Sequence, residues 1–113
     1  MVLLRFKYGV VVGVLDTNLL PGLLSLCHFM ETILGVHEIT ITSVNDGTHK
    51  PGSLHYSGQA IDIRSKIYPK PEVSRVVQEF KKLYDAEYDL IWENPGEPAE
   101  HLHLEFDPGN TNY

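Results

Sequence analysis

The segment from residue 101 to residue 106 constrains the fold of this chain most, because its polar and apolar residues alternate strictly. It reads His-Leu-His-Leu-Glu-Phe. Successive side chains of a β-strand point to opposite faces of the sheet, so a period of two predicts a strand with one aliphatic face and one ionisable face. A fold that contains this strand buries the leucines against a core and presents His101, His103 and Glu105 on the other side.

A second segment of the same kind lies earlier in the chain. In the run Ile-Asp-Ile-Arg, which begins at residue 61, the two isoleucines share one face, and Asp62 and Arg64 share the other. If the two strands are neighbours, Asp62 and His103 converge on one point, and His55 can join them from the segment that precedes Asp62. Of the other histidines, His28 and His37 are expected to be ordinary solvated or locally bonded side chains.

The remaining elements follow from the spacing of apolar residues and from turn residues. A helix is predicted from Pro21 to Gly35, and a second helix is predicted to begin at Pro71. Strands are expected in the ranges 3–15 (broken near one of its glycines), 38–43, 59–64, 88–93 and 101–106. Because strands and helices are mixed without a regular strand–helix–strand rhythm, we expect one domain, 1–113, of the α+β class with a mostly antiparallel sheet and two main helices.

Composition and charge argue against several classes of protein. Fifteen acidic residues against nine basic ones give a net charge of −6, and no basic run is present, which argues against nucleic-acid binding. The single cysteine, Cys27, cannot form an internal disulfide, so any metal must be held by histidines and carboxylates. The apolar stretch 9–15 is too short to span a bilayer, and no small-x-small cleavage site follows it. We therefore expect a strand there, without a signal peptide or a membrane anchor.

The predicted convergence of His55, Asp62 and His103 suits zinc chemistry. Three protein ligands of the histidine and carboxylate type, with a fourth position open to water, are typical of catalytic zinc sites. Hydrolysis also needs a base, and Glu100 is the carboxylate nearest in sequence to His103 on its N-terminal side. The parity of Glu100 is wrong for the ligand face, so this role requires the strand to begin after it or to bulge there. His101 lies on the ligand face and could donate to the developing oxyanion.

The pattern also resembles a known family. The motif Ser-x-His-x-x-Gly-x-Ala-x-Asp, which begins at Ser53, is followed by Glu-x-x-His, which begins at Glu100. Together these motifs resemble the zinc peptidases of the D-alanyl-D-alanine carboxypeptidase and lysostaphin group, whose fold is shared with the hedgehog signalling domain. The resemblance covers roughly residues 39–108 and is greatest to small, endolysin-like phage and bacterial peptidases. The small residues around the presumed ligands also indicate a crowded backbone.

The resemblance implies a role for each matching residue. His55, Asp62 and His103 would bind Zn2+, Glu100 would be the general base, and His101 would assist at the transition state. Ser53 would help to fix the ligand loop.

One feature departs from the family pattern. Many members have an arginine upstream of the first ligand that contacts substrate or oxyanion, and no arginine lies between Gly35 and His55 here. His49, Lys50 or Arg64 is expected to take its place.

The function implied by the resemblance is hydrolysis of peptide bonds in peptidoglycan stem peptides by a zinc metallopeptidase, with endo- and carboxypeptidase action both open. We expect a monomer, made in the cytoplasm, that reaches the cell wall only when the membrane is breached. The alternative is a non-catalytic zinc-binding module with a hedgehog-like fold. A cupin-like metal barrel also uses His-x-His, but it would place this pair early in the chain rather than near its end.

Overall fold

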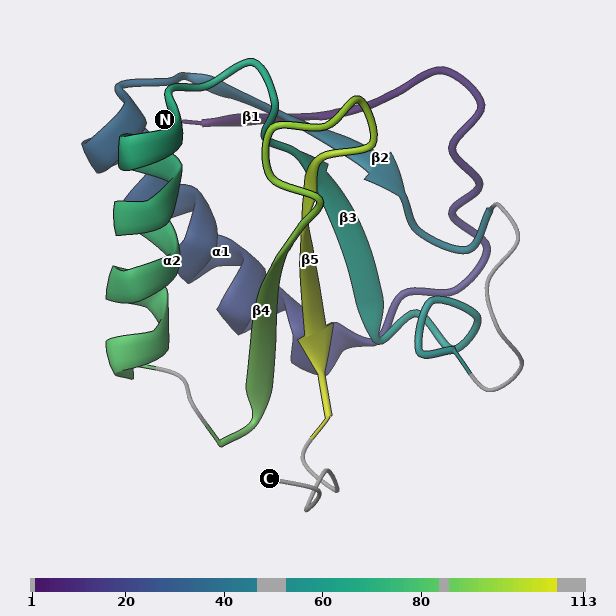
Figure 1. Cartoon of the computed structure of the whole chain (residues 1–113). Coiled ribbons are helices and arrows are strands. Elements are labelled where there is room, and N and C mark those ends of the chain that lie inside the picture. Colours follow the sequence, from purple (N-terminus) through teal and green to yellow (C-terminus); the bar gives the residue numbers. More distant parts are fainter. Residues whose placement is uncertain (1, 47–52, 84–85, 108–113) are drawn as a thin grey trace.

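The protein has a five-stranded sheet with two helices packed on one side of it (Figure 1). The computed structural model describes residues 2–46, 53–83 and 86–107. The strand order across the sheet is β1–β2–β3–β5–β4. The strands are β1 (Leu3–Phe6), β2 (Glu38–Ser43), β3 (Ala60–Arg64), β4 (Tyr88–Glu93) and β5 (His101–Phe106).

The sheet is mixed, which corrects the prediction of a mostly antiparallel one. β1 pairs in parallel with β2, whereas the pairs β2–β3, β3–β5 and β4–β5 are antiparallel. The segment between β1 and β2 contains η1 (Thr17–Leu19), α1 (Leu20–Phe29) and η2 (Met30–Leu34). A parallel pair needs such a crossover connection, usually a helix. The first helix therefore belongs to a strand–helix–strand unit that the sequence pattern did not reveal. The α+β class with two main helices is confirmed.

Both predicted helices are present. α1 and η2 together cover most of the range from Pro21 to Gly35, and Gly35 follows them with a φ of 70°, in the left-handed region that glycine adopts without strain. α2 (Lys70–Leu83) begins one residue before Pro71. No helix in the described ranges 2–46, 53–83 and 86–107 combines the length and apolar character that crossing a membrane requires.

The strand expected over residues 3–15 ends at Phe6. A left-handed Gly9, with a φ of 91°, turns the chain, and the following residues do not continue the ladder. Instead, the backbone N–H groups of Gly13 and Val14 each donate to the side-chain oxygen Oδ1 of Asn45 at 2.7 Å. This apolar stretch is therefore not a strand. Its backbone is irregular and is bonded to the side chain of Asn45.

The two faces of the sheet differ as the alternation predicts. The core lies between the helices and one face, and its largest members are fully buried: Phe80, Leu19, Leu26, Met30, Ile39, Ile41, Ile61, Ile63, Leu90, Leu102 and Leu104. On the opposite face, the register between β3 and β5 pairs Asp62 with His103 and Arg64 with His101. The two strands are therefore neighbours, which is the condition under which Asp62 and His103 were expected to converge.

The predicted crowding around Gly58 is also confirmed. Gly58 has a φ of 74°, and a Cβ atom there would lie 2.5 Å from the carbonyl oxygen of Val14 and 2.7 Å from the Cα atom of Leu15. The turn before β3 therefore packs directly on the backbone of residues 14–15, and Ala60 at the start of β3 is fully buried. This contact anchors the turn that contains His55.

Candidate metal centre

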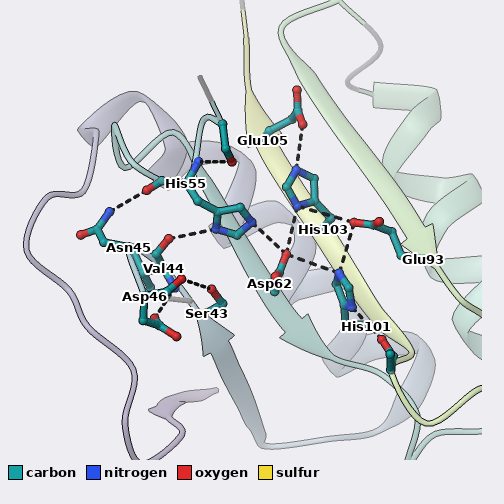
Figure 2. Close-up of polar contacts among 12 residues, drawn as sticks. Ser43, Val44, Asn45, Asp46, His55, Asp62, Glu93, His101, His103 and Glu105 are labelled. Atoms are coloured by element: carbon teal, nitrogen blue, oxygen red, sulfur yellow. Dashed lines mark hydrogen bonds and ion pairs between the residues drawn. The ribbon is translucent and has the colours of Figure 1, made fainter. Parts of the chain in front are cut away.

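A group of imidazoles and carboxylates lies on the open face of the sheet, around one oxygen of Asp62 (Figure 2). We call it the imidazole cluster, and it consists of His55, Asp62, Glu93, His101, His103 and Glu105. Asp62 Oδ1 lies 2.9 Å from His103 Nδ1, 3.2 Å from His55 Nε2 and 3.6 Å from His101 Nε2. The convergence of His55, Asp62 and His103 predicted from the sequence is therefore present.

His55 is held in place by three contacts outside the sheet. Its backbone N–H donates to Ser53 Oγ at 3.2 Å, and its carbonyl oxygen accepts from Asn45 Nδ2 at 2.7 Å. Its ring nitrogen Nδ1 lies 2.9 Å from the carbonyl oxygen of Val44. The side chain is buried. Ser53 and Asn45 therefore both help to hold the loop that contains His55, and Asn45 was not among the residues predicted for the site.

The outer nitrogen of each clustered imidazole bonds to an acceptor. A carbonyl oxygen can only accept, so His55 carries its proton on Nδ1, toward Val44, and His101 carries one on Nδ1, 2.9 Å from the carbonyl oxygen of Ala99. His103 Nε2 lies 2.8 Å from Glu105 Oε1. The inner nitrogen of each ring then faces Asp62. Metal-binding histidines typically have this arrangement, because the outer hydrogen bond selects the tautomer and the ring orientation.

The distances within the cluster fit a zinc ion. Tetrahedral ligands at 2.0–2.1 Å from zinc lie about 3.3–3.4 Å apart. The inner nitrogens of His55 and His103 lie 3.2 Å and 2.9 Å from Asp62 Oδ1, and suitable atoms of the three residues all lie within 4.8 Å of one another. Two neutral imidazoles and one carboxylate are a suitable zinc donor set. A second grouping, Asp62, Glu93 and His101, meets the same distance limit.

Without a metal, His103 holds a proton that faces Asp62. Burial alone would lower the pKa of His103, but hydrogen bonds to Asp62 and Glu105 outweigh it and raise this pKa to about 9. Burial alone would raise the pKa of Asp62, but the neighbouring imidazoles, first His103 and then His55, hold it well below its usual range. A metal bound at His103 Nδ1 would replace the proton there.

Two carboxylates of the cluster were not identified as site residues from the sequence. Glu93 lies at the end of β4, where it pairs with His101 across the β4–β5 register, and its Oε1 lies 3.2 Å from His101 Nε2. Glu105 is two residues after His103 on the same face. The alternation in β5 placed Glu105 on this face, but Glu93 could be found only from the pairing of β4 with β5.

Glu100 does not lie in the imidazole cluster. Its carboxylate accepts hydrogen bonds from Ser65 Oγ at 2.8 Å, Trp92 Nε1 at 3.0 Å and the backbone N–H of Gly96 at 2.9 Å, and it forms an ion pair with Lys70. We call these five residues the Glu100 network. Burial alone would raise the pKa of Glu100, but these hydrogen bonds lower it to about 2. Glu100 was noted to have the wrong parity for the face of β5 that presents His101 and His103, and its side chain indeed lies in this separate network rather than facing the imidazole cluster.

Two cavities flank the cluster. A cavity of about 440 Å³ is lined by His103, Glu93 and Glu105 together with Ser53, Leu54, Ile91 and Asp107. A smaller cavity of about 220 Å³ beside His101 is lined in part by Lys7, Arg64 and Lys66. Arg64 therefore lies near the cluster, and its role in substrate binding stays a prediction. His49 and Lys50, the other candidates for that role, lie outside the described residues.

Comparisons with family models, with curated proteins and with solved structures return no match. The resemblance to zinc peptidases therefore stays a prediction that depends on the motifs alone.

Proposed function

We propose that this chain is a zinc-dependent peptidase. One observation carries the proposal: the inner nitrogens of His55 and His103 face the same oxygen of Asp62, while the outer nitrogens are held by Val44 and Glu105. Such preorganisation favours metal binding, because the ligands need little rearrangement when the ion enters. The order and spacing of these residues also match the motif of the resembling peptidases.

Zinc bound by His55, Asp62 and His103 would lower the pKa of a water ligand to about 7 and would polarise a peptide carbonyl. The residues of the chain supply the remaining functions. Asp62 contributes the only ligand charge, so the site keeps a net positive charge that favours a developing oxyanion. His101 has its Nε2 directed into the cluster, and in its doubly protonated form it would donate a hydrogen bond from this nitrogen to that oxyanion while Nδ1 donates to Ala99.

The space around the cluster supports a peptide substrate. The 440 Å³ cavity opens beside His103 and has room for part of a peptide chain. In the smaller cavity, Lys7 and Arg64 have no side-chain hydrogen bond or ion pair with other described residues. Although Glu100 also lines this cavity, cations without an ion-pair partner among the described residues, in a protein of net charge −6, favour an anionic group of the substrate there. We propose a peptidoglycan stem peptide, which carries carboxylates and matches the substrates of the resembling family.

A non-catalytic zinc-binding module is the second candidate. The position of Glu100 favours it, because the carboxylate expected to act as the base is fully engaged elsewhere. In that case zinc would stabilise the fold without turnover.

Mass spectrometry of purified peptidoglycan incubated with the zinc-loaded protein separates these candidates. We expect new peptide fragments that disappear with a chelator and are absent with His55→Ala. The exposed variant Glu79→Gln, on the helix side of the sheet, is the control and should release the same fragments. Bound zinc without fragments from several wall chemotypes would favour the non-catalytic module.

A further inference from the structure

We infer that Glu93, at the end of β4, is the general base of the proposed peptidase. This inference rests on the proposed function and adds to it a residue that the sequence motif does not contain. Glu93 Oε1 lies 3.8 Å from His103 Nδ1 and 3.2 Å from His101 Nε2 (Figure 2). It is thus adjacent to the ligand atoms.

The strand pairing gives Glu93 a fixed position beside the ligands. In the β4–β5 register, Glu93 is opposite His101 and Ile91 is opposite His103, so the Glu93 side chain emerges on the ligand face. Its side chain is 42% exposed, and it lines the same cavity as His103. A general base must come within hydrogen-bond distance of the proton that it removes. Glu93 meets this requirement for a water molecule located between His103 and the substrate cavity.

The other carboxylates near the site are already engaged. Asp62 is the proposed ligand, and Glu105 bonds to the outer nitrogen of His103, on the side of the ring away from Asp62. The Glu100 side chain is fully buried and accepts from several fixed donors. Glu105 also lines the cavity, but its carboxylate is bonded to the outer nitrogen of His103 and its side chain is only 17% exposed. Glu93 lies on the inner side, near His103 Nδ1, and its side chain is the more exposed of the two.

The contact with His101 orients the base. His101 Nδ1 is fixed by the carbonyl oxygen of Ala99, so its Nε2 holds a constant position beside Glu93 Oε1. A side chain held in this way loses less conformational entropy at the transition state. We therefore treat His101 as a positioning residue for Glu93 as well as a candidate oxyanion donor.

The step assigned to Glu93 is a transfer of one proton. Its carboxylate accepts a proton from water while the water oxygen forms a bond to the carbonyl carbon of the substrate peptide. The proton then passes to the peptide nitrogen as the C–N bond breaks. One water is consumed, a carboxylic acid and an amine are released, and Glu93 returns to its ionised form.

Two substitutions test this role, with soluble muropeptides from purified peptidoglycan as substrate. In Glu93→Gln, we expect kcat to fall by about 100- to 10,000-fold, while zinc content, KM and Tm remain close to those of the wild type. In Glu93→Ala, we expect the same loss, with part of the rate restored by added formate, because a small carboxylate fits the space left by the side chain. Formate should not rescue Glu93→Gln, whose side chain still fills that space. Glu79→Gln controls for the loss of one carboxylate.

The outcomes distinguish this inference from the proposed function. A zinc-loaded Glu93→Gln variant with the wild-type rate would overturn the assignment of the base and leave the peptidase intact. The assignment would also fail if Glu100→Gln, folded and zinc-loaded, lost its activity while Glu93→Gln kept it. A wild-type protein that binds zinc but cleaves no muropeptide would overturn the proposed function, and the role of Glu93 with it.

Discussion

Asp62 and Glu100 are both carboxylates with several hydrogen-bond partners, but they lie in regions of opposite character. Asp62 faces imidazole nitrogens, which can release a proton and bind a metal instead. Glu100 faces an ammonium group, an indole N–H, a hydroxyl and a backbone N–H, none of which is a metal ligand in its protonated form. The imidazole nitrogens could therefore bind a metal in place of protons, whereas the partners of Glu100 offer no atom that binds a metal.

This difference distinguishes the proposed metal site from a structural network, although the charge and burial of the two carboxylates are similar. Both carboxylates have pKa values below the usual range, and both have mostly buried side chains. The chemistry of the partners distinguishes them. The predictions below test this distinction by removing one member of each region and measuring zinc affinity and stability separately.

Asp62→Asn should have the largest effect on metal binding. It removes the only charged member of the proposed ligand set and the oxygen on which the imidazoles converge. We expect zinc affinity to fall by more than about 100-fold, because loss of an outer partner already costs 10–100-fold. Competition with a chromophoric chelator measures it, with Glu79→Gln as control. Wild-type affinity in Asp62→Asn would place the metal elsewhere.

Glu100→Gln should lower the stability of the protein and leave its zinc affinity unchanged. We expect a loss of about 2–4 kcal/mol in the free energy of unfolding, because an amide leaves Lys70 without its charge partner and presents N–H groups to Trp92 and Ser65. Zinc affinity should stay close to wild type. Urea unfolding of the metal-free proteins measures the change, with the exposed Glu97→Gln as a control from the same loop. A stable Glu100→Gln that has lost zinc would reverse the two roles.

Lowering the pH should reduce the difference in the free energy of unfolding between wild type and Glu100→Gln. The pKa of Glu100 is lowered from 4.5 to about 2 in the folded protein. A group with a depressed folded pKa stabilises the protein above its unfolded pKa, and this contribution is lost as the pH falls through the folded value. The stability difference should therefore be constant above about pH 5 and should shrink toward pH 2. A difference that does not change with pH would show that the charge of Glu100 is not the source of the stability.

The sequence predicted the grouping of His55, Asp62 and His103 and much of the sheet for one physical reason. Alternation in β3 and β5 is a local property, and it determines which side chains share a face once two strands pair. The bounds of β4 and β5 were predicted as observed, and His55, Asp62 and His103 lie together. Glu100 could not be placed in the same way, because it lies just before β5, in a loop whose path depends on Lys70 and Trp92 from elsewhere in the chain.

The errors also have a common cause. The strand expected over residues 3–15 and the mostly antiparallel sheet both depend on contacts between distant segments. The side chain of Asn45 takes the backbone N–H groups of Gly13 and Val14, which a strand ladder would otherwise use. Glu93 was missed because its own strand contains no histidine, and only the register with β5 brings it to His101.

Glu105→Gln should have a smaller effect than Asp62→Asn and tests whether the outer shell of the cluster tunes the metal. Glu105 Oε1 accepts the outer hydrogen bond of His103, so its negative charge makes the inner nitrogen Nδ1 a stronger donor to zinc. The amide can still accept this bond but lacks the charge. We expect zinc affinity to fall by about 10- to 100-fold, with a stoichiometry of one ion unchanged. Complete loss of zinc would indicate that Glu105 is itself a ligand, whereas no loss would mean that the ring of His103 is held by Asp62 alone.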